Sequence, residues 1–204
     1  MGSFYIHSPK ELSYVHIPRT GLGMKAYITK YLKEYTQLND SDTWMINHPN
    51  LKTVKLYYPD AKSLSVVRNP WQRIYSFYTI VTTNLYWDGW SSQSFENEKD
   101  FNKWVTAYAN PEIEFQFPRW FDRFTNMYEF LIDDNNNYVD FILKAENLEE
   151  DFKVVQDYLE LNHTLPNITN LQNHYEYKKY YNSESAELIR KMFEKDCELF
   201  KYVY

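Results

Sequence analysis

The chain has 204 residues, 44% of them hydrophobic and 25% charged, which is ordinary for a globular protein with a single core. Its net charge of −6 argues against a general nucleic-acid binder and against a polybasic membrane anchor, although a few local arginines could still hold an anionic ligand. One cysteine excludes an internal disulfide bond, and no apolar run reaches the roughly 18 residues that a membrane-spanning helix needs. No set of cysteines and histidines has the spacing of metal ligands, so we expect no metal site.

The first half of the chain alternates short apolar runs with segments of helical periodicity, after a polar, loosely held lead-in over residues 1–12. The expected elements are a strand at 14–17, a helix at 24–35, a turn-rich linker at 37–42, a strand at 43–46, a short helix at 51–58, a turn at 58–62, a strand at 63–67 and a helix at 70–82. This alternation predicts an α/β fold with a central parallel sheet flanked by helices.

The second half begins with a segment over residues 84–125 that breaks the alternation and is rich in aromatic, polar and acidic residues. We interpret it as an insertion, within a single domain spanning 1–204, that covers the functional site. The elements expected in this half are a helix at 100–108, a hairpin of 127–132 and 138–143 around a turn at 133–137, an amphipathic helix at 148–161 capped by Asn147, a polar loop at 162–182 and a last helix at 184–200.

The first candidate site follows the strand at 14–17. A turn with two of the chain's four glycines, Gly21 and Gly23, leads from this strand into the next predicted helix. Unpaired backbone N–H groups at a helix N-terminus favour an anion, and glycine lets the backbone approach it closely. Arg19 and Thr20 add a cation and a hydroxyl, so the stretch is typical of a phosphate-binding loop. It is not a Walker A loop, since no Gly-Lys-Ser/Thr follows the glycines, and many turns of this kind bind nothing.

The second candidate site is Arg68-Asn-Pro-Trp-Gln-Arg-Ile-Tyr-Ser76, which starts at a strand end and continues into a helix. Arg73 lies one helical turn before Ser76 and is therefore close to it in space. A guanidinium fork together with a hydroxyl makes a good clamp for a phosphate. The alternative is that Arg68 caps a strand end and Ser76 only packs against a neighbour.

The predicted topology connects the two candidate sites. Arg19, His48 and Arg68 each follow a predicted strand. Because the carboxyl ends of parallel strands lie at one edge of a sheet, where ligands of such sheets bind, we expect these three residues to meet there. His48 is a candidate general base because imidazole ionises near neutral pH, although a histidine before Pro49 is otherwise a surface or turn residue.

Together the two candidate sites resemble the paired 5′- and 3′-phosphate loops of sulfotransferases that use 3′-phosphoadenosine 5′-phosphosulfate (PAPS), on the carbohydrate-sulfotransferase side of that family. The similarity continues through Val139–Phe152 and through Asp196 and Tyr202 near the C-terminus, and it fades over 84–112. It implies a P-loop-NTPase-like sulfotransferase fold in a small soluble chain of a microbial or viral kind. Many animal relatives carry a Golgi membrane anchor, which this chain lacks, so we expect a cytoplasmic enzyme or one trimmed of its anchor.

The resemblance also implies an activity and the residues for it. The enzyme would move a sulfuryl group from PAPS to a hydroxyl on a small molecule or glycan, leaving 3′-phosphoadenosine 5′-phosphate (PAP). Arg68 and Ser76 would hold the 3′-phosphate, with Arg73 beside them, and His48 would be the general base. The residues implied to bind the other end of the cofactor are Arg19, Thr20, Gly21, Leu22, Gly23 and Met24.

The first loop departs from the family pattern at two positions. Arg19 stands where the family has lysine and can still stabilise the oxygen of the leaving group, while Gly23 replaces a threonine and loses one phosphate contact. Two other functions therefore stay open. A non-catalytic PAPS- or PAP-binding protein is compatible with the altered loop. An ATP-dependent small-molecule kinase is disfavoured by the missing Walker lysine and by the Arg68 and Ser76 clamp.

Overall fold

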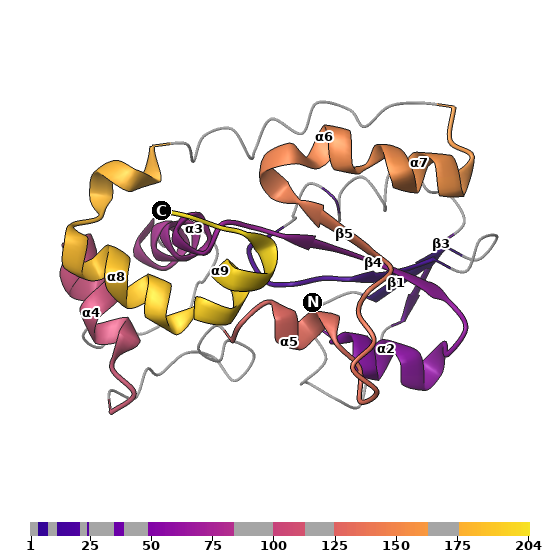
Figure 1. Cartoon of the computed structure of the whole chain (residues 1–204), viewed down its shortest axis with the longest axis horizontal. Coiled ribbons are helices and arrows are strands. Elements are labelled where there is room, and N and C mark those ends of the chain that lie inside the picture. The colour runs from indigo at the N-terminus through magenta and orange to yellow at the C-terminus, as the bar shows by residue number, and fades with distance from the viewer. Residues whose placement is uncertain are drawn as a thin grey trace. The chain divides into compact units, whose positions relative to one another are not determined.

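The computed structural model in Figure 1 describes the chain in segments that form two compact units. The described residues are 4–7, 12–20, 24, 35–38, 49–83, 100–112, 125–162 and 176–204. Unit 1 combines residues 1–68 with 119–171 and holds the sheet, whereas the described elements of unit 2, from 69–118 and 172–204, are helices. Each unit has its own buried core.

Among the described residues, unit 1 is built on a five-stranded sheet in the order β3-β1-β2-β4-β5. The strands are β1 Phe4–His7, β2 Leu12–Val15, β3 Tyr35–Leu38, β4 Lys62–Val67 and β5 Phe141–Lys144. β2, β4 and β5 run parallel, and β1 pairs antiparallel with both β2 and β3. The predicted α/β class with a parallel sheet is confirmed, and β1 and β3 extend one side of it through antiparallel pairing.

Helices cover the sheet on both sides in Figure 1, with α6 and α7 on one side and α2 and α5 on the other. Side chains that alternate along the strands form the core under α6 Leu148–Asp151 and α7 Lys153–Leu159. The members of this core are Leu12, Tyr14, Met24, Leu64, Val66, Leu143, Ala145, Leu148, Phe152, Val155 and Leu159. Burial of this apolar set positions the parallel strands and therefore the loops at their ends.

Two predictions near the N-terminus are wrong. The lead-in over 1–12 contains strand β1 and the first residue of β2, and the linker at 37–42 begins inside β3. Both added strands are short and obtain their hydrogen bonds by pairing with a neighbouring strand, a contact that local composition does not reveal. The helix at 24–35 starts as expected at Met24, but Tyr35 already belongs to β3. Residues 25–34 and the predicted strand at 43–46 lie outside the described residues.

The middle of unit 1 follows the sequence closely. Helix α2 Leu51–Tyr57 begins at Asn50, whose side chain accepts a hydrogen bond from the Thr53 amide at 2.9 Å. A turn then leads into β4, as predicted.

The predicted hairpin over 127–143 is also wrong. Its first arm is a short helix, α5 Tyr128–Leu131, and the antiparallel contact is a single bridge between Ile132 and Tyr138. The turn itself is present and is held by Asp133, whose Oδ1 accepts hydrogen bonds from the amides of Asn135 and Asn137 at 2.8 and 2.9 Å. The second arm forms β5, which pairs with β4 in parallel because the sheet offers β5 a longer partner than the α5 segment does.

The helix predicted at 148–161 is interrupted at Phe152, which is buried under the sheet between α6 and α7. Asn147 ends the short helix η2 Ala145–Asn147 and occupies the N-cap position of α6, but its side chain does not cap. Instead, Asn147 Nδ2 donates to Asp151 Oδ1 at 2.8 Å, and Asp151 Oδ2 accepts from the Lys144 amide at 2.7 Å. Asn147 therefore occupies the predicted N-cap position, but its side chain bonds to Asp151 and does not accept a hydrogen bond from the first turn of the helix.

Unit 2 surrounds helix α3 Pro70–Thr83, which confirms the helix predicted at 70–82. Its other described elements are α4 Phe101–Ala109, η4 Tyr177–Tyr180, α8 Ser183–Met192 and α9 Glu194–Phe200, so the last predicted helix is divided at Phe193. Aromatic rings pack in the core, where the Trp104 ring is stacked with Tyr108 at 4.9 Å and meets Phe77 edge to face at 5.8 Å between ring centroids. In the part of the chain that the structure describes, no helix is long and apolar enough to cross a membrane.

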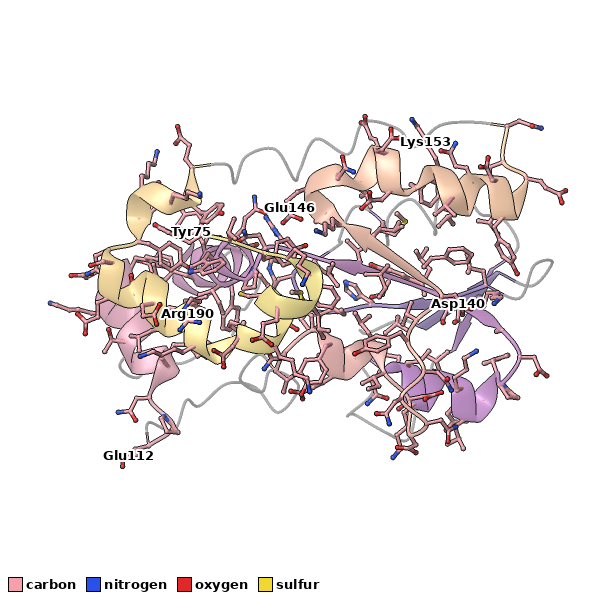
Figure 2. The ribbon with its side chains drawn as sticks, in the orientation of Figure 1. Tyr75, Glu112, Asp140, Glu146, Lys153 and Arg190 are labelled. Atoms are coloured by element: carbon pink, nitrogen blue, oxygen red, sulfur yellow. The ribbon has the colours of Figure 1, made fainter. Side chains whose placement is uncertain are left out.

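Asp140 ties the start of β4 to the start of β5 (Figure 2) and leads to a prediction about acid stability. Its carboxylate accepts hydrogen bonds from Lys62 Nζ at 2.6 Å and from the Ser63 amide and hydroxyl at 2.9 Å each. Burial acts to raise the pKa of Asp140, but these hydrogen bonds outweigh it and hold the pKa below its ordinary value.

We predict that Asp140→Asn lowers the free energy of unfolding at pH 7 by about 1–2 kcal/mol. Because the pKa of Asp140 is lower in the folded state, its carboxylate stabilises the fold at pH values above the unfolded-state pKa of about 4. This stabilisation is lost as the pH falls through the folded-state pKa. The difference between wild type and variant should therefore shrink below roughly pH 4 in urea unfolding series. Asp60→Asn, in the exposed turn before β4, is the matched control; an Asp140 effect that is constant with pH would contradict this account.

Candidate functional site

The turn after β2 is the described part of the first candidate loop. Thr20 closes it, since the Thr20 amide and hydroxyl both donate to the Ile17 carbonyl, at 3.4 and 2.9 Å. Arg19 has φ 66°, in the left-handed region that non-glycine residues seldom adopt. Gly21, Leu22 and Gly23 lie outside the described residues, and Met24 beyond them is helical and fully buried in the core of unit 1. The order of strand, turn and helix thus agrees with the sequence prediction.

The end of β4 lies beside this turn. Arg68, which follows β4, is only 3% exposed, and its Nη1 donates to the Arg19 carbonyl at 3.1 Å. Its backbone amide lies 3.4 Å from Met127 Sδ. The expected meeting of Arg19 and Arg68 at the carboxyl edge of the sheet is therefore confirmed, and it follows from the parallel pairing of β2 with β4. His48, the third residue expected there, lies outside the described residues.

A carboxylate follows the third parallel strand. Lys144 is the register partner of Val67, so Glu146 comes after the end of β5 as Arg68 comes after the end of β4. Glu146 is exposed and is labelled in Figure 2. From the sequence, Glu146 is an alternative to His48 as the base, together with His174 and the carboxylates of 84–125. The parallel pairing of β5 would have been the signal that places Glu146 at the functional edge.

Unit 2 carries the helical part of the second candidate site. Asn69 caps α3, because its Oδ1 accepts from the amides of Trp71 and Gln72 at 3.1 and 3.2 Å. Farther along the helix, Arg73 and Ser76 are 1% and 0% exposed. The structure thus keeps these two residues on one helix at the expected spacing, and both belong to the interior of the unit.

The surroundings of Arg73 were not apparent from its motif. Its Cζ lies 5.8 Å from the ring centroid of Phe193, and burial lowers the pKa of its guanidinium to about 10, against the opposing effects of Asp196 and Tyr108. Arg73 is therefore still a cation at neutral pH. Asp196 is fully buried on α9, although the sequence showed it only as part of a C-terminal pattern.

The described residues contain no group of three or more His, Cys, Asp and Glu side chains that could hold a metal ion. In unit 1 the described candidate residues Arg19, Thr20 and Arg68 provide cationic side chains and the backbone of a turn, a donor set that suits phosphate and sulfate groups.

Comparison with known proteins identifies the class. A family model described as the sulfotransferase family matches residues 3–203, which is almost the whole chain. The chain therefore belongs to the sulfotransferase family, and the resemblance drawn from the two motifs is confirmed at this level. The comparisons with curated proteins and with solved structures gave no match.

The left-handed backbone of Arg19 leads to a prediction about the stability of the turn. A residue with a side chain is about 1–2 kcal/mol less stable than glycine in this backbone region. We expect Arg19→Gly to be more stable than Arg19→Ala by about 1 kcal/mol in urea unfolding. The control pair is Asp157→Gly and Asp157→Ala on exposed α7, where alanine should be the more stable by roughly 0.5–1 kcal/mol. Equal stability of the two Arg19 variants would show that the turn has a different backbone in solution.

Proposed function

We propose that this sulfotransferase transfers a sulfuryl group from PAPS to a hydroxyl acceptor, with a carbohydrate as the expected acceptor class, and releases PAP. The observation that carries the proposal is the contact between Arg68 and the Arg19 carbonyl, in a chain whose family is established over residues 3–203. This contact joins the two motifs that the family uses for its cofactor at the carboxyl edge of the parallel sheet.

The donor set fits the cofactor chemically. When bound, PAPS supplies an activated sulfuryl group, and its transfer leaves additional negative charge on the PAP oxygen. In this proposal, Arg68 and Ser76 hold the 3′-phosphate with Arg73 beside them. Arg19 stabilises the charge that develops on the leaving oxygen, because a cation fixed near that oxygen acts most strongly in the transition state.

The first loop has a narrower role than its sequence indicated. The Thr20 hydroxyl hydrogen is donated to the Ile17 carbonyl, so Thr20 maintains the turn, while the backbone from Thr20 through Gly21, Leu22, Gly23 and Met24 is proposed to bind the 5′ side of PAPS. Proton removal from the acceptor hydroxyl is assigned to His48; the alternative bases are Glu146, His174 and the carboxylates of 84–125, of which Glu146 follows a described parallel strand.

The proposal predicts a nucleotide preference that depends on Arg68. Isothermal titration calorimetry should show tighter binding of PAP than of AMP or ATP, and Arg68→Ala should weaken PAP by roughly 2–4 kcal/mol with little effect on AMP. Ser76→Ala should act in the same direction by a smaller amount. Arg190→Ala, which removes an exposed arginine of α8, is the control.

Several outcomes would redirect the proposal. Equal affinity for PAP and AMP in the wild type would contradict the 3′-phosphate assignment. Tight PAP binding without sulfuryl transfer to any hydroxyl acceptor, measured with radiolabelled PAPS, would favour the non-catalytic binding protein. Mg²⁺-dependent consumption of ATP would favour the kinase.

We also predict that His48→Asn lowers kcat by about 10²–10⁴-fold and leaves PAP affinity nearly unchanged, because a general base acts only on the acceptor proton. The wild-type rate should rise with pH through a pKa near ~6–7, the range of free imidazole, and this limb should vanish in the variant. The matched variant Glu146→Gln tests the competing base. Near-normal transfer by folded His48→Asn together with loss of transfer in Glu146→Gln would assign the proton to Glu146.

A further inference from the structure

The interior of unit 2 contains two opposite charges. Among the residues that the structure describes in this unit, the buried charged side chains are Arg73 on α3 and Asp196 on α9, at 1% and 0% exposure. An ionised side chain away from water is strongly unfavourable unless an opposite charge or hydrogen bonds compensate for it. Asp196 acts electrostatically to raise the pKa of Arg73, the direction expected for an opposite charge in the same interior.

The guanidinium of Arg73 is also covered by an aromatic ring. Its Cζ lies 5.8 Å from the centroid of Phe193, a residue that is 1% exposed and separates α8 from α9. The ring that covers Arg73 and the buried Asp196 carboxylate come from the same C-terminal helical segment.

The same C-terminal segment holds the start of α3 at three further points. Asn69 Nδ2 donates to the Val203 carbonyl at 3.3 Å, and Trp71 Nε1 donates to the Ala186 carbonyl at 2.8 Å. The Tyr181 hydroxyl donates to the Trp71 carbonyl, also at 2.8 Å. The first turn of α3 is thus fixed by residues 181–203, and Arg73 follows Trp71 by two residues on the way to Ser76.

We propose that Arg73 is a positioning residue whose buried pairing with Asp196 fixes α3 against α9 and so places the Ser76 hydroxyl for the 3′-phosphate of the cofactor. Ser76 lies three residues beyond Arg73, on the same side of the helix. The inference rests on the proposed function and replaces the direct phosphate contact that the motif implied for Arg73.

The test measures PAP and AMP affinities of Arg73→Gln, Asp196→Asn and the double variant, with Arg190→Gln on the surface of α8 as control. We expect each single change to weaken PAP about 10- to 100-fold, the loss typical when a group that orients a ligand-binding residue is removed. AMP affinity should change little. The double variant should bind PAP about as tightly as whichever single variant binds it more weakly, because both substitutions remove the same interaction between Arg73 and Asp196.

Two further variants separate positioning from a general loss of structure. In a Ser76→Ala background, Asp196→Asn should have no additional effect on PAP affinity, since the group that it positions is gone. Arg73→Lys keeps the positive charge beside Asp196 and should recover part of the PAP affinity that Arg73→Gln loses.

The outcomes distinguish the inference from the proposed function. A wild type that binds PAP no better than AMP contradicts the proposed function. If the wild type prefers PAP and Asp196→Asn keeps that preference while Arg73→Gln loses it, Arg73 is a direct ligand and the inference is overturned. Normal PAP affinity in both variants would also overturn the inference, because neither residue would then affect the cofactor site. If Arg73→Gln does not fold, Asp196→Asn alone decides, because a direct ligand predicts unchanged PAP affinity and a positioning pair predicts its loss.

Discussion

The parallel pairing of β2 with β4 is the constraint on which the candidate site depends. Val15 and Ser65 are register partners, and the Ser65 hydroxyl donates to the Val15 carbonyl at 2.7 Å, so the two strands are joined near their carboxyl ends by more than the backbone ladder. The turn with Arg19 and the residue Arg68 start from these ends. A shift of one residue in this register would move the buried serines to the apolar face under α6 and α7 and would separate the two motifs.

The second half of the cofactor motif depends on a different kind of interaction. In unit 1 an apolar layer fixes the strands, whereas in unit 2 the start of α3 is held by hydrogen bonds and by a cation–ring contact from the C-terminal segment. Burial of polar groups is tolerated only where each finds a partner of suitable geometry. A helix held in this way has little freedom to rotate, which would suit the role proposed for the Ser76 hydroxyl.

The elements with strong local signals were predicted well. The helices predicted at 51–58, 70–82 and 100–108 and the strand predicted at 63–67 are present as α2, α3, α4 and β4. The strands β1 and β3 and the helix α5 were missed because short segments obtain their conformation from the partner they pair with or pack against. Phe152 and Phe193 each divide a predicted helix into two, and both side chains are buried.

By itself the sequence determined the family and the residue types of the site, because the motifs at Arg19 and at Arg68 to Ser76 are local and specific. It also determined that Arg19 and Arg68 meet, since alternating strands and helices imply a common carboxyl edge. Only the tertiary structure decided that β5 runs parallel to β4 and that Arg73 shares the interior with Asp196. Both facts join residues more than seventy positions apart, and no spacing along the chain encodes such contacts.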